Sequence, residues 1–292
     1  MMVLLRRRRS ELRSGYARVG RLLLHHVVGG RGSPTVLFVH GLGSAGFLGW
    51  RYTLPTVAAH RRVVAPDLPG FGLSDKPDLR YGVPLFARTL ARYIERGRLG
   101  RPVVVGASMG GRVALELALR HPGKVSRVVL VNSLGLGFPR TWAHGFLLLP
   151  GVGETLFQLT GAALHRMPPD SVRRLAVRLR LATNPERTLD DLQLEALREI
   201  HADAGTAPAF LTTVRSLALR SADDVLSDLP RLGVPLRLIW GVDDPLFPVG
   251  QAERAHRLVP GSRLTVIENA GHTPEIEQPE RFLEALLPSL ED

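Results

Sequence analysis

The sequence predicts an α/β fold: a mostly parallel, doubly wound sheet with an inserted helical lid. Two observations lead to this prediction. Short β-branched runs alternate with helical patterns in the first half of the chain and again near its end. Runs that are apolar at every position are typical of parallel strands buried on both faces. Between about residues 134 and 220 the pattern is helical throughout, which indicates an insertion between two strands of the sheet.

Prolines and glycines mark the expected elements of the first half. Pro34 precedes the first buried run and glycines follow it, so this run is bounded as a strand should be. The helix that follows the second strand is expected to end at Gly100 and Pro102. We expect strands at 35–39, 62–65, 102–105 and 125–131, and helices at 85–98 and 112–120.

The same alternation returns after the insertion. We expect strands at 236–240 and 264–267, and helices at 251–259 and 280–287. Within the insertion, proline pairs and proline–glycine pairs predict helix breaks at 150–151, 168–169, 184–185 and 207–208. The expected organisation is a basic tail at 1–15, a core at 16–133 and 214–292, and a lid at 134–213.

Composition excludes several classes of protein. The 292 residues include no cysteine, which excludes disulfides, thiolate metal sites and a cysteine nucleophile. The net charge of +11 suggests an anionic partner, but all basic residues except Lys76 and Lys124 are arginines, and aromatics amount to only 6%. We therefore favour a bias toward arginine over a nucleic-acid site. No targeting or membrane-spanning segment is evident, so we expect a cytoplasmic protein without an integral membrane segment. The role of the tail is open.

A dinucleotide-binding site is one alternative. Gly41, Gly43 and Gly46 fit G-x-G-x-x-G directly after a buried strand, and Asp67 follows the next strand. Such a site needs a helix that starts at the glycines. Here the segment runs on to Pro55 without a good first helical turn, so we regard a nucleotide-binding oxidoreductase as the weaker hypothesis.

The residues Gly106-Ala107-Ser108-Met109-Gly110 match G-x-S-x-G between a strand and a helix. A serine on so tight a turn has strained backbone angles, and its neighbours two positions before and after nearly touch. Only glycine fits there. The hydroxyl of Ser108 is then exposed as a nucleophile, and the Met109 amide points to where an oxyanion would form.

A serine nucleophile needs a base and an acid to orient that base. Among ten histidines, His272 stands in a loop after a predicted strand, at the edge where catalytic residues of parallel sheets gather. Asp243 and Asp244 follow another strand, between serine and histidine in chain order, and spacing does not decide between them. The glycine-rich turn after His40 exposes the Leu42 amide as a second oxyanion donor.

Together these landmarks resemble the α/β-hydrolase fold family. The resemblance extends from about residue 20 to the C-terminus and rests on His40-Gly41, 66–74, 106–111, 241–248 and Gly271-His272. It implies that Asp244 is the catalytic acid, because Gly241 to Pro248 matches the G-x-x-D-x-x-x-P loop of the family. It also implies an oxyanion hole from the Leu42 and Met109 amides and a helical cap over the site.

The resemblance implies a serine hydrolase that needs no cofactor or metal and acts on a small-molecule ester or related acyl substrate. We expect a fairly hydrophobic carboxylic ester. Hydrolysis of a carbon–carbon bond in ring-cleavage dienones is the alternative, because 106–111 agrees with the G-x-S-M-G-G of those relatives, although their usual tryptophan after the histidine is Thr273 here. Candidate pocket residues, which could instead serve helix packing, are His40, Gly41, Phe138, Trp142, Phe146 and Phe247.

Overall fold

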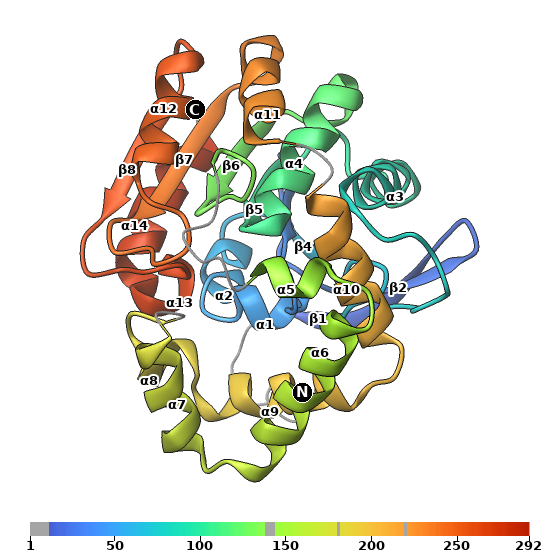
Figure 1. Ribbon diagram of the computed structural model, residues 1–292. Coiled ribbons are helices and arrows are strands. Elements are labelled where there is room, and N and C mark those ends of the chain that lie inside the picture. The colour runs from blue at the N-terminus through green and yellow to red at the C-terminus, as the bar shows by residue number, and fades with distance from the viewer. Residues whose placement is uncertain (1–11, 138–143, 180–181, 219–220, 292) are drawn as a thin grey trace.

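The computed structural model describes residues 12–137, 144–179, 182–218 and 221–291. Within these ranges eight strands form one sheet in the order β1-β2-β4-β3-β5-β6-β7-β8 (Figure 1). The strands are β1 (Arg13–Val19), β2 (Leu22–Gly29), β3 (Val36–Val39), β4 (Val63–Pro66), β5 (Val103–Ala107), β6 (Arg127–Val131), β7 (Leu236–Gly241) and β8 (Arg263–Ile267).

The sheet is parallel from β4 to β8 and antiparallel where β2 joins β1 and β4. In the centre, Phe38 of β3 is paired with Val105 of β5, and Val105 with Val129 of β6. A parallel pair needs a crossover, so helices separate these strands along the chain. The predicted α/β fold with a mostly parallel sheet is therefore confirmed.

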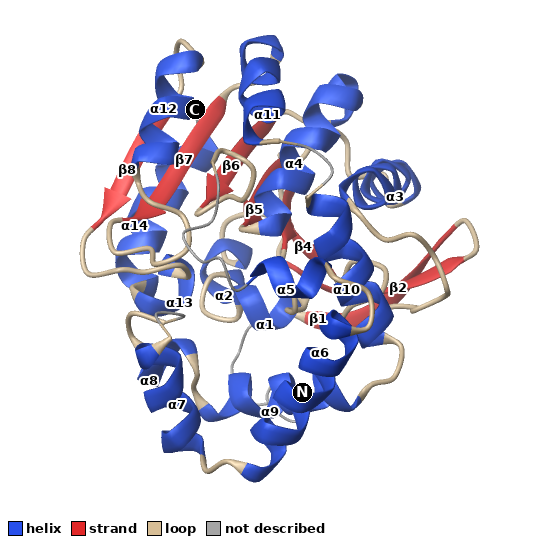
Figure 2. Cartoon of the chain, in the orientation of Figure 1, coloured by secondary structure: helices blue, strands red, loops and turns tan. Residues whose placement is uncertain are grey.

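Helices lie on both sides of the sheet and in a separate group (Figure 2). The helices are α1 (Gly46–Trp50), α2 (Leu54–Ala58), α3 (Val83–Arg96), α4 (Met109–Arg120), α5 (His144–Leu148), α6 (Val152–Arg166), α7 (Pro169–Arg178), α8 (Pro185–Thr188), α9 (Asp191–Ala202), α10 (Thr206–Leu217), α11 (Ala222–Asp228), α12 (Gly250–Leu258), α13 (Pro274–Glu277) and α14 (Pro279–Glu291), with short 3-10 turns at Pro122–Lys124 and Leu229–Arg231.

The sheet separates two apolar clusters, one on each face. Alternate residues of a strand enter different clusters: Leu37 packs on the side of α3 and α4, and Phe38 on the side of α1 and α14. This alternation follows from the period of two in a strand. Trp50, tilted against Phe38 and Phe282, fills the second cluster. Burial on both faces explains why the strand sequences are apolar at every position.

The segment between β6 and α11 contains α5 to α10 and no strand among its described residues. Helices α6, α7, α8 and α9 lie together below the sheet in the view of Figure 1. The predicted helix break at 207–208 is wrong, because α10 begins at Thr206 and continues through Pro208. Proline is tolerated there since the first amides of a helix have no acceptor. Residue 213, the expected end of the lid, lies inside α10.

The N-terminal boundary also needs correction. Residues 13–15, which we assigned to the tail, belong to strand β1. This edge strand alternates small, aromatic and basic residues, and it pairs with β2 from Arg13↔Val28 to Val19↔Leu22. Its mixed composition conceals it in the sequence. In the part of the chain that the structure describes, no helix is long and apolar enough to cross a membrane.

The burial of a leucine in the apolar clusters predicts how strongly its exchange for alanine lowers the free energy of unfolding. Leu286 of α14 is fully buried in the second cluster, whereas Leu159 of α6 is 61% exposed. We expect Leu286→Ala to lower the free energy of unfolding by about 3 kcal/mol through the cavity it leaves. The same exchange at Leu159 should change it by less than about 0.5 kcal/mol. Urea denaturation of both variants tests this, and equal losses would contradict it.

Candidate active site

Ser108 stands alone between a strand and a helix. Strand β5 ends at Ala107 and α4 begins at Met109, so Ser108 forms the whole turn. Its backbone has φ 51° and ψ −118°, a conformation that side-chain-bearing residues rarely adopt. Such strain persists only where the surroundings enforce it, and it lifts the side chain away from the strand.

The two glycines of the motif are required by close backbone contacts. A Cβ on Gly106 would lie 2.3 Å from the carbonyl oxygen of Gly110, and one on Gly110 would lie 2.2 Å from that of Val39. Backbone atoms at these distances cannot move aside cheaply. The turn therefore closes only with hydrogen at both positions, as its sequence predicts.

His272 and Asp244 reach this turn from the ends of β8 and β7. The imidazole Nε2 of His272 lies 3.1 Å from Ser108 Oγ, and its Nδ1 lies 3.0 Å from Asp244 Oδ2. The His272 side chain is 16% exposed and that of Asp244 is fully buried. Three side chains from distant parts of the chain thus form one continuous hydrogen-bonded row.

The structure also separates the two adjacent aspartates. Asp243 is exposed, and its carbonyl oxygen accepts a hydrogen bond of 3.2 Å from the hydroxyl of Thr183. The Asp244 carboxylate instead accepts from the Leu246 and Phe247 amides through Oδ1, at 2.7 and 3.0 Å. Its other oxygen is left to face the imidazole.

Asn132, which the sequence analysis missed, ties these loops together. It follows β6 directly, and its Nδ2 donates to Asp244 Oδ2 at 2.5 Å and to the Gly271 carbonyl at 3.2 Å. Its Oδ1 accepts from the Gly241 amide at 3.0 Å. Burial alone would raise the pKa of Asp244, but the charge of His272 and the bonds from His272 and Asn132 outweigh it and lower that pKa.

Two glutamates of α13 lie close to the imidazole loop, and the sequence analysis missed both. Glu277 accepts from the Gly271 amide at 2.9 Å and from the Thr273 amide at 3.1 Å, so it holds the backbone on either side of His272. Glu275 is 3% exposed, and its Oε2 has no hydrogen-bond partner among the described residues. Burial raises the pKa of Glu275 to about 8.

The pKa of His272 reflects two opposing effects. Burial lowers it, because a charged imidazolium is poorly solvated there. The charge and the hydrogen bond of Asp244 raise it, with a further contribution from the charge of Glu277. The effects that raise the pKa are the larger, so the pKa of His272 lies above its ordinary value of 6.5.

The turn after β3 lies against the serine. A Cβ on Gly41 would be 3.4 Å from Ser108 Cβ and 4.0 Å from its Oγ. The Leu42 and Met109 amides have no hydrogen-bond partner among the described residues. Met109 is the first residue of α4, where amides have no acceptor within the helix. Both amides are thus free to donate to another group.

His40 supports this turn from inside the protein. It is fully buried, its Nε2 accepts from the Leu68 amide at 3.0 Å, and its Nδ1 donates to the Gly41 carbonyl at 2.8 Å. This pattern fixes a neutral imidazole, and burial lowers its pKa. His40 therefore does not line a pocket, contrary to the expectation from sequence.

The other expected pocket residues have different positions. Phe247 is buried, with its ring 5.4 Å from that of His272, whereas Phe146 of α5 is 46% exposed. Phe138 and Trp142 lie outside the described residues.

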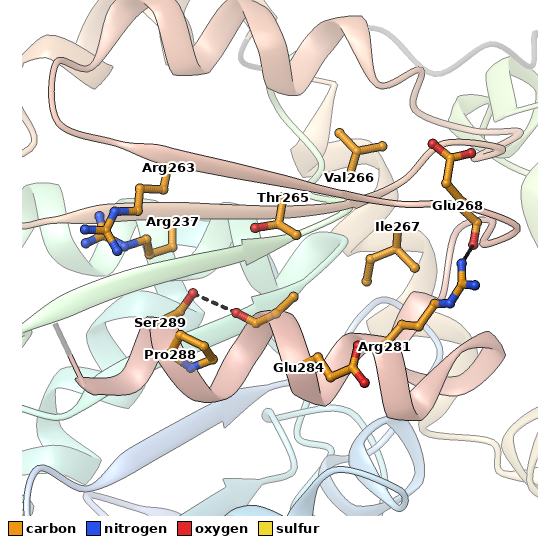
Figure 3. Close-up of a pocket in the computed structure, with 11 residues that line it drawn as sticks. Arg237, Arg263, Thr265, Val266, Ile267, Glu268, Arg281, Glu284, Pro288 and Ser289 are labelled. Atoms are coloured by element: carbon orange, nitrogen blue, oxygen red, sulfur yellow. Dashed lines mark hydrogen bonds between the residues drawn. The ribbon is translucent and has the colours of Figure 1, made fainter.

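Two surface cavities bear on where a ligand could bind. One of about 160 Å³ lies between the loops after β3 and β4 and helix α9, and Ala45, Leu73 and Leu192 contribute to its lining. Another of about 430 Å³ lies between β8 and α14 (Figure 3). Neither cavity is lined by Ser108, Asp244 or His272.

The geometry does not favour the dinucleotide-binding hypothesis. Asp67 is buried, and its Oδ1 accepts from the Gly46 amide at 2.7 Å while Oδ2 accepts from Leu73 and faces His25. This carboxylate is engaged inside the protein and not open to a ribose. Gly46 has a packing role, since a Cβ there would lie 2.4 Å from the Ala65 carbonyl. The described residues also contain no group of three or more potential metal ligands.

Comparison with known proteins decides the family. A family model described as alpha/beta hydrolase fold matches residues 34–279, most of the chain. The chain belongs to the α/β-hydrolase fold family. The serine turn, the loops after β7 and β8 and the strands β3 to β8 of this α/β hydrolase all lie within the matched range.

Three relatives illustrate the range of proteins that this α/β hydrolase resembles. It is 30% identical to 2-hydroxy-6-oxo-2,4-heptadienoate hydrolase of Pseudomonas putida, over 91% of this chain and 94% of that one. It is 29% identical to pimeloyl-[acyl-carrier protein] methyl ester esterase of Aeromonas hydrophila, over 87% and 94%. The crystal structure of Cfl2 from Burkholderia cenocepacia superposes with a TM-score of 0.81 at 25% identity, over 96% of each chain.

The opposing effects of burial and of Asp244 predict how the pKa of His272 changes in the variant Asp244→Asn. Asp244→Asn removes the charge that raises the pKa of His272 and leaves burial dominant, so that pKa should fall below 6.5. Asp243→Asn, at the exposed neighbour, should leave it above 6.5. Titration of the His272 ring protons by NMR measures both. An unchanged value in Asp244→Asn, or the same fall in both variants, would refute the assignment.

Proposed function

We propose that this α/β hydrolase cleaves carboxylic esters through an acyl-enzyme intermediate on Ser108. The observation that carries the proposal is the row in which Ser108 Oγ, His272 and Asp244 are joined at 3.1 and 3.0 Å. A hydroxyl, an imidazole and a buried carboxylate in this order are the arrangement that activates a serine for attack on a carbonyl.

In the first half of the reaction, Ser108 Oγ bonds to the ester carbonyl carbon and its proton passes to His272 Nε2. Asp244 accepts the hydrogen bond from Nδ1, so it keeps the correct tautomer and stabilises the imidazolium. His272 then gives the proton to the departing alkoxide as the carbon–oxygen bond breaks. Water deacylates Ser108 by the same route, releasing the acid and restoring the hydroxyl.

The negative charge that forms on the carbonyl oxygen needs donors placed in advance. The Met109 amide at the start of α4 and the Leu42 amide in the turn against Ser108 are suited to this role, because neither has a partner among the described residues. Amide donors that are fixed in advance stabilise an oxyanion strongly. We assign the oxyanion hole to these two groups.

A neutral, fairly hydrophobic ester is the substrate that we infer from the 160 Å³ cavity at the loop after β3. The 160 Å³ cavity begins at Ala45, shortly after the Leu42 turn, and combines apolar side chains with Glu195, Glu199 and Asp203. No arginine or lysine is found among the described residues that line it. Lys76 pairs with Asp203 at 3.1 Å, but Glu195 and Glu199 still leave an excess of carboxylates at this cavity, which disfavours an anionic substrate. We also assign the helices between residues 134 and 213 to a cap over the site.

Carbon–carbon bond hydrolysis is the second candidate. Its support is the 30% identity to a dienoate hydrolase of Pseudomonas putida, over nearly the whole of both chains. The same serine and histidine can serve a reaction in which carbon, and not oxygen, leaves the carbonyl. The residue after His272 is Thr273, whose hydroxyl donates a hydrogen bond to Glu277 Oε1 at 3.1 Å.

The role of Ser108 predicts the outcome of its removal. Ser108→Ala should lower kcat for p-nitrophenyl butyrate by about 10⁴-fold or more, because the covalent intermediate can no longer form there. A fluorophosphonate probe should label Ser108 and leave Ser227 unlabelled. Ser227→Ala is the matched control and should keep full activity, since its exposed hydroxyl contacts only the Asp224 carbonyl. A folded Ser108→Ala variant with parental activity would refute the proposal.

A substrate series distinguishes the two candidate reactions. We expect kcat/KM for neutral p-nitrophenyl esters to rise with acyl chain length from acetate to hexanoate, as apolar surface is buried. It should exceed kcat/KM for a 2-hydroxy-6-oxo-dienoate by at least about 100-fold, because that substrate is anionic. Absorbance of p-nitrophenolate and loss of dienoate absorbance measure the two. A dienoate value equal to or above the ester values would favour the carbon–carbon reaction.

A further inference from the structure

A second row of serine, histidine and aspartate lies at the edge of the sheet. Ser14 Oγ of β1 is 2.8 Å from Nε2 of His25 in β2, and His25 Nδ1 is 2.8 Å from Asp67 Oδ2. The order of atoms is that of the Ser108 row: hydroxyl to Nε2, Nδ1 to carboxylate. Ser14 belongs to the outermost strand, so this row is on a different part of the sheet from the row at the β5 turn (Figure 1).

The histidine of this second row is held firmly in one tautomer. Asp67 accepts amide hydrogen bonds on both of its oxygens, and burial, which alone would raise its pKa, is outweighed by the hydrogen bonds from His25 and the Leu73 amide. An ionised Asp67 requires the proton on His25 Nδ1, which leaves Nε2 as an acceptor for the Ser14 hydroxyl. The backbone of His25 is fixed as well, since its amide donates to Ser74 Oγ at 3.0 Å.

Access differs sharply along the row. His25 and Asp67 are each 1% exposed, whereas Ser14 is an exposed residue of an edge strand. The ring of Tyr16, two residues on, lies edge-on to His25 at 5.3 Å and covers the imidazole from solvent. The acceptor nitrogen is therefore shielded, and the hydroxyl that bonds to it belongs to an exposed residue.

The setting of Ser14 lacks one feature of the Ser108 turn. Ser14 lies within a regular antiparallel strand, in which successive amides point to opposite edges. Its own strand therefore presents no pair of converging donors for an oxyanion. Only acyl groups with a good leaving group can react at such a hydroxyl, because the intermediate receives little stabilisation.

We propose that Ser14 is a second acyl-accepting serine, which His25 and Asp67 activate toward small activated acyl donors such as aryl esters. Ser14 Oγ bonds to the acyl carbon, and the bond from that carbon to the aryl oxygen breaks. The aryloxide leaves with the electron pair, and the Ser14 proton passes to His25 Nε2 and from there to the departing aryloxide. Water hydrolyses the Ser14 ester slowly, so the acyl group accumulates on the protein.

The test uses the Ser108→Ala variant, in which the other serine cannot react. The full-length variant is treated with p-nitrophenyl acetate, and acetylation is followed with time by mass spectrometry of peptides. Ser14 should be acetylated at least about 100-fold faster than Ser227, an exposed serine without a histidine, since a positioned general base contributes at least this much. Ser14→Ala in this background should abolish the label and lower the residual p-nitrophenolate release.

A second variant separates activation from mere exposure. His25→Gln in the Ser108→Ala background keeps Ser14 exposed but removes the base, so acetylation of Ser14 should fall to the rate of Ser227. Equal labelling of Ser14 and Ser227 before this change, or unchanged labelling after it, would overturn the proposal. The comparison of the two serines decides even if His25→Gln does not fold. Ser14→Ala alone should leave kcat/KM at Ser108 unchanged.

Discussion

The approach of three backbone segments around Ser108 is the constraint on which the site depends. Strand β3, the serine turn and the start of α4 meet so closely that only hydrogen fits at Gly106 and Gly110. This contact forces the positive φ of Ser108 and also brings Gly41 against its side chain. Because parallel strands end at one edge of the sheet, the loops after β6, β7 and β8 can then supply the remaining polar groups.

The two serine rows have the same order of hydrogen-bonded groups but lie in different backbone surroundings. Both join a hydroxyl through an imidazole to a buried carboxylate, at distances between 2.8 and 3.1 Å. Ser108 stands on a strained turn beside unpaired amides, whereas Ser14 stands in a regular strand. A proton path alone can raise the nucleophilicity of a hydroxyl, but stabilisation of the developing charge requires donors fixed in advance. Sequence motifs predict fixed oxyanion donors better than they predict a proton path from a hydroxyl.

The sequence predicted the sheet and the elements that surround it because buried strands and helices have distinct periods. It also indicated Ser108, Asp244 and His272, which follow β5, β7 and β8. Catalytic residues of parallel sheets gather at these carboxyl ends of the strands. Asn132 obeys the same rule after β6 and was missed because no motif accompanies it. Strand β1 was missed because an edge strand needs little apolar sequence, and with it the Ser14 row, which arises from pairing across β1 and β2. Spacing left Asp243 and Asp244 open and the family resemblance implied Asp244, which is the aspartate that lies against His272.

The buried Glu275, on α13 beside the His272 loop, makes the stability of the fold depend on pH. Its carboxyl is buried and keeps its proton up to a pH of about 8, whereas the same group in an unfolded chain loses it near 4.5. Between these values the folded chain holds a proton that the unfolded chain releases, so folding becomes steadily less favourable as the pH rises through that window. The protein should therefore resist denaturation better in mildly acidic surroundings than in mildly alkaline ones, as far as this group is concerned.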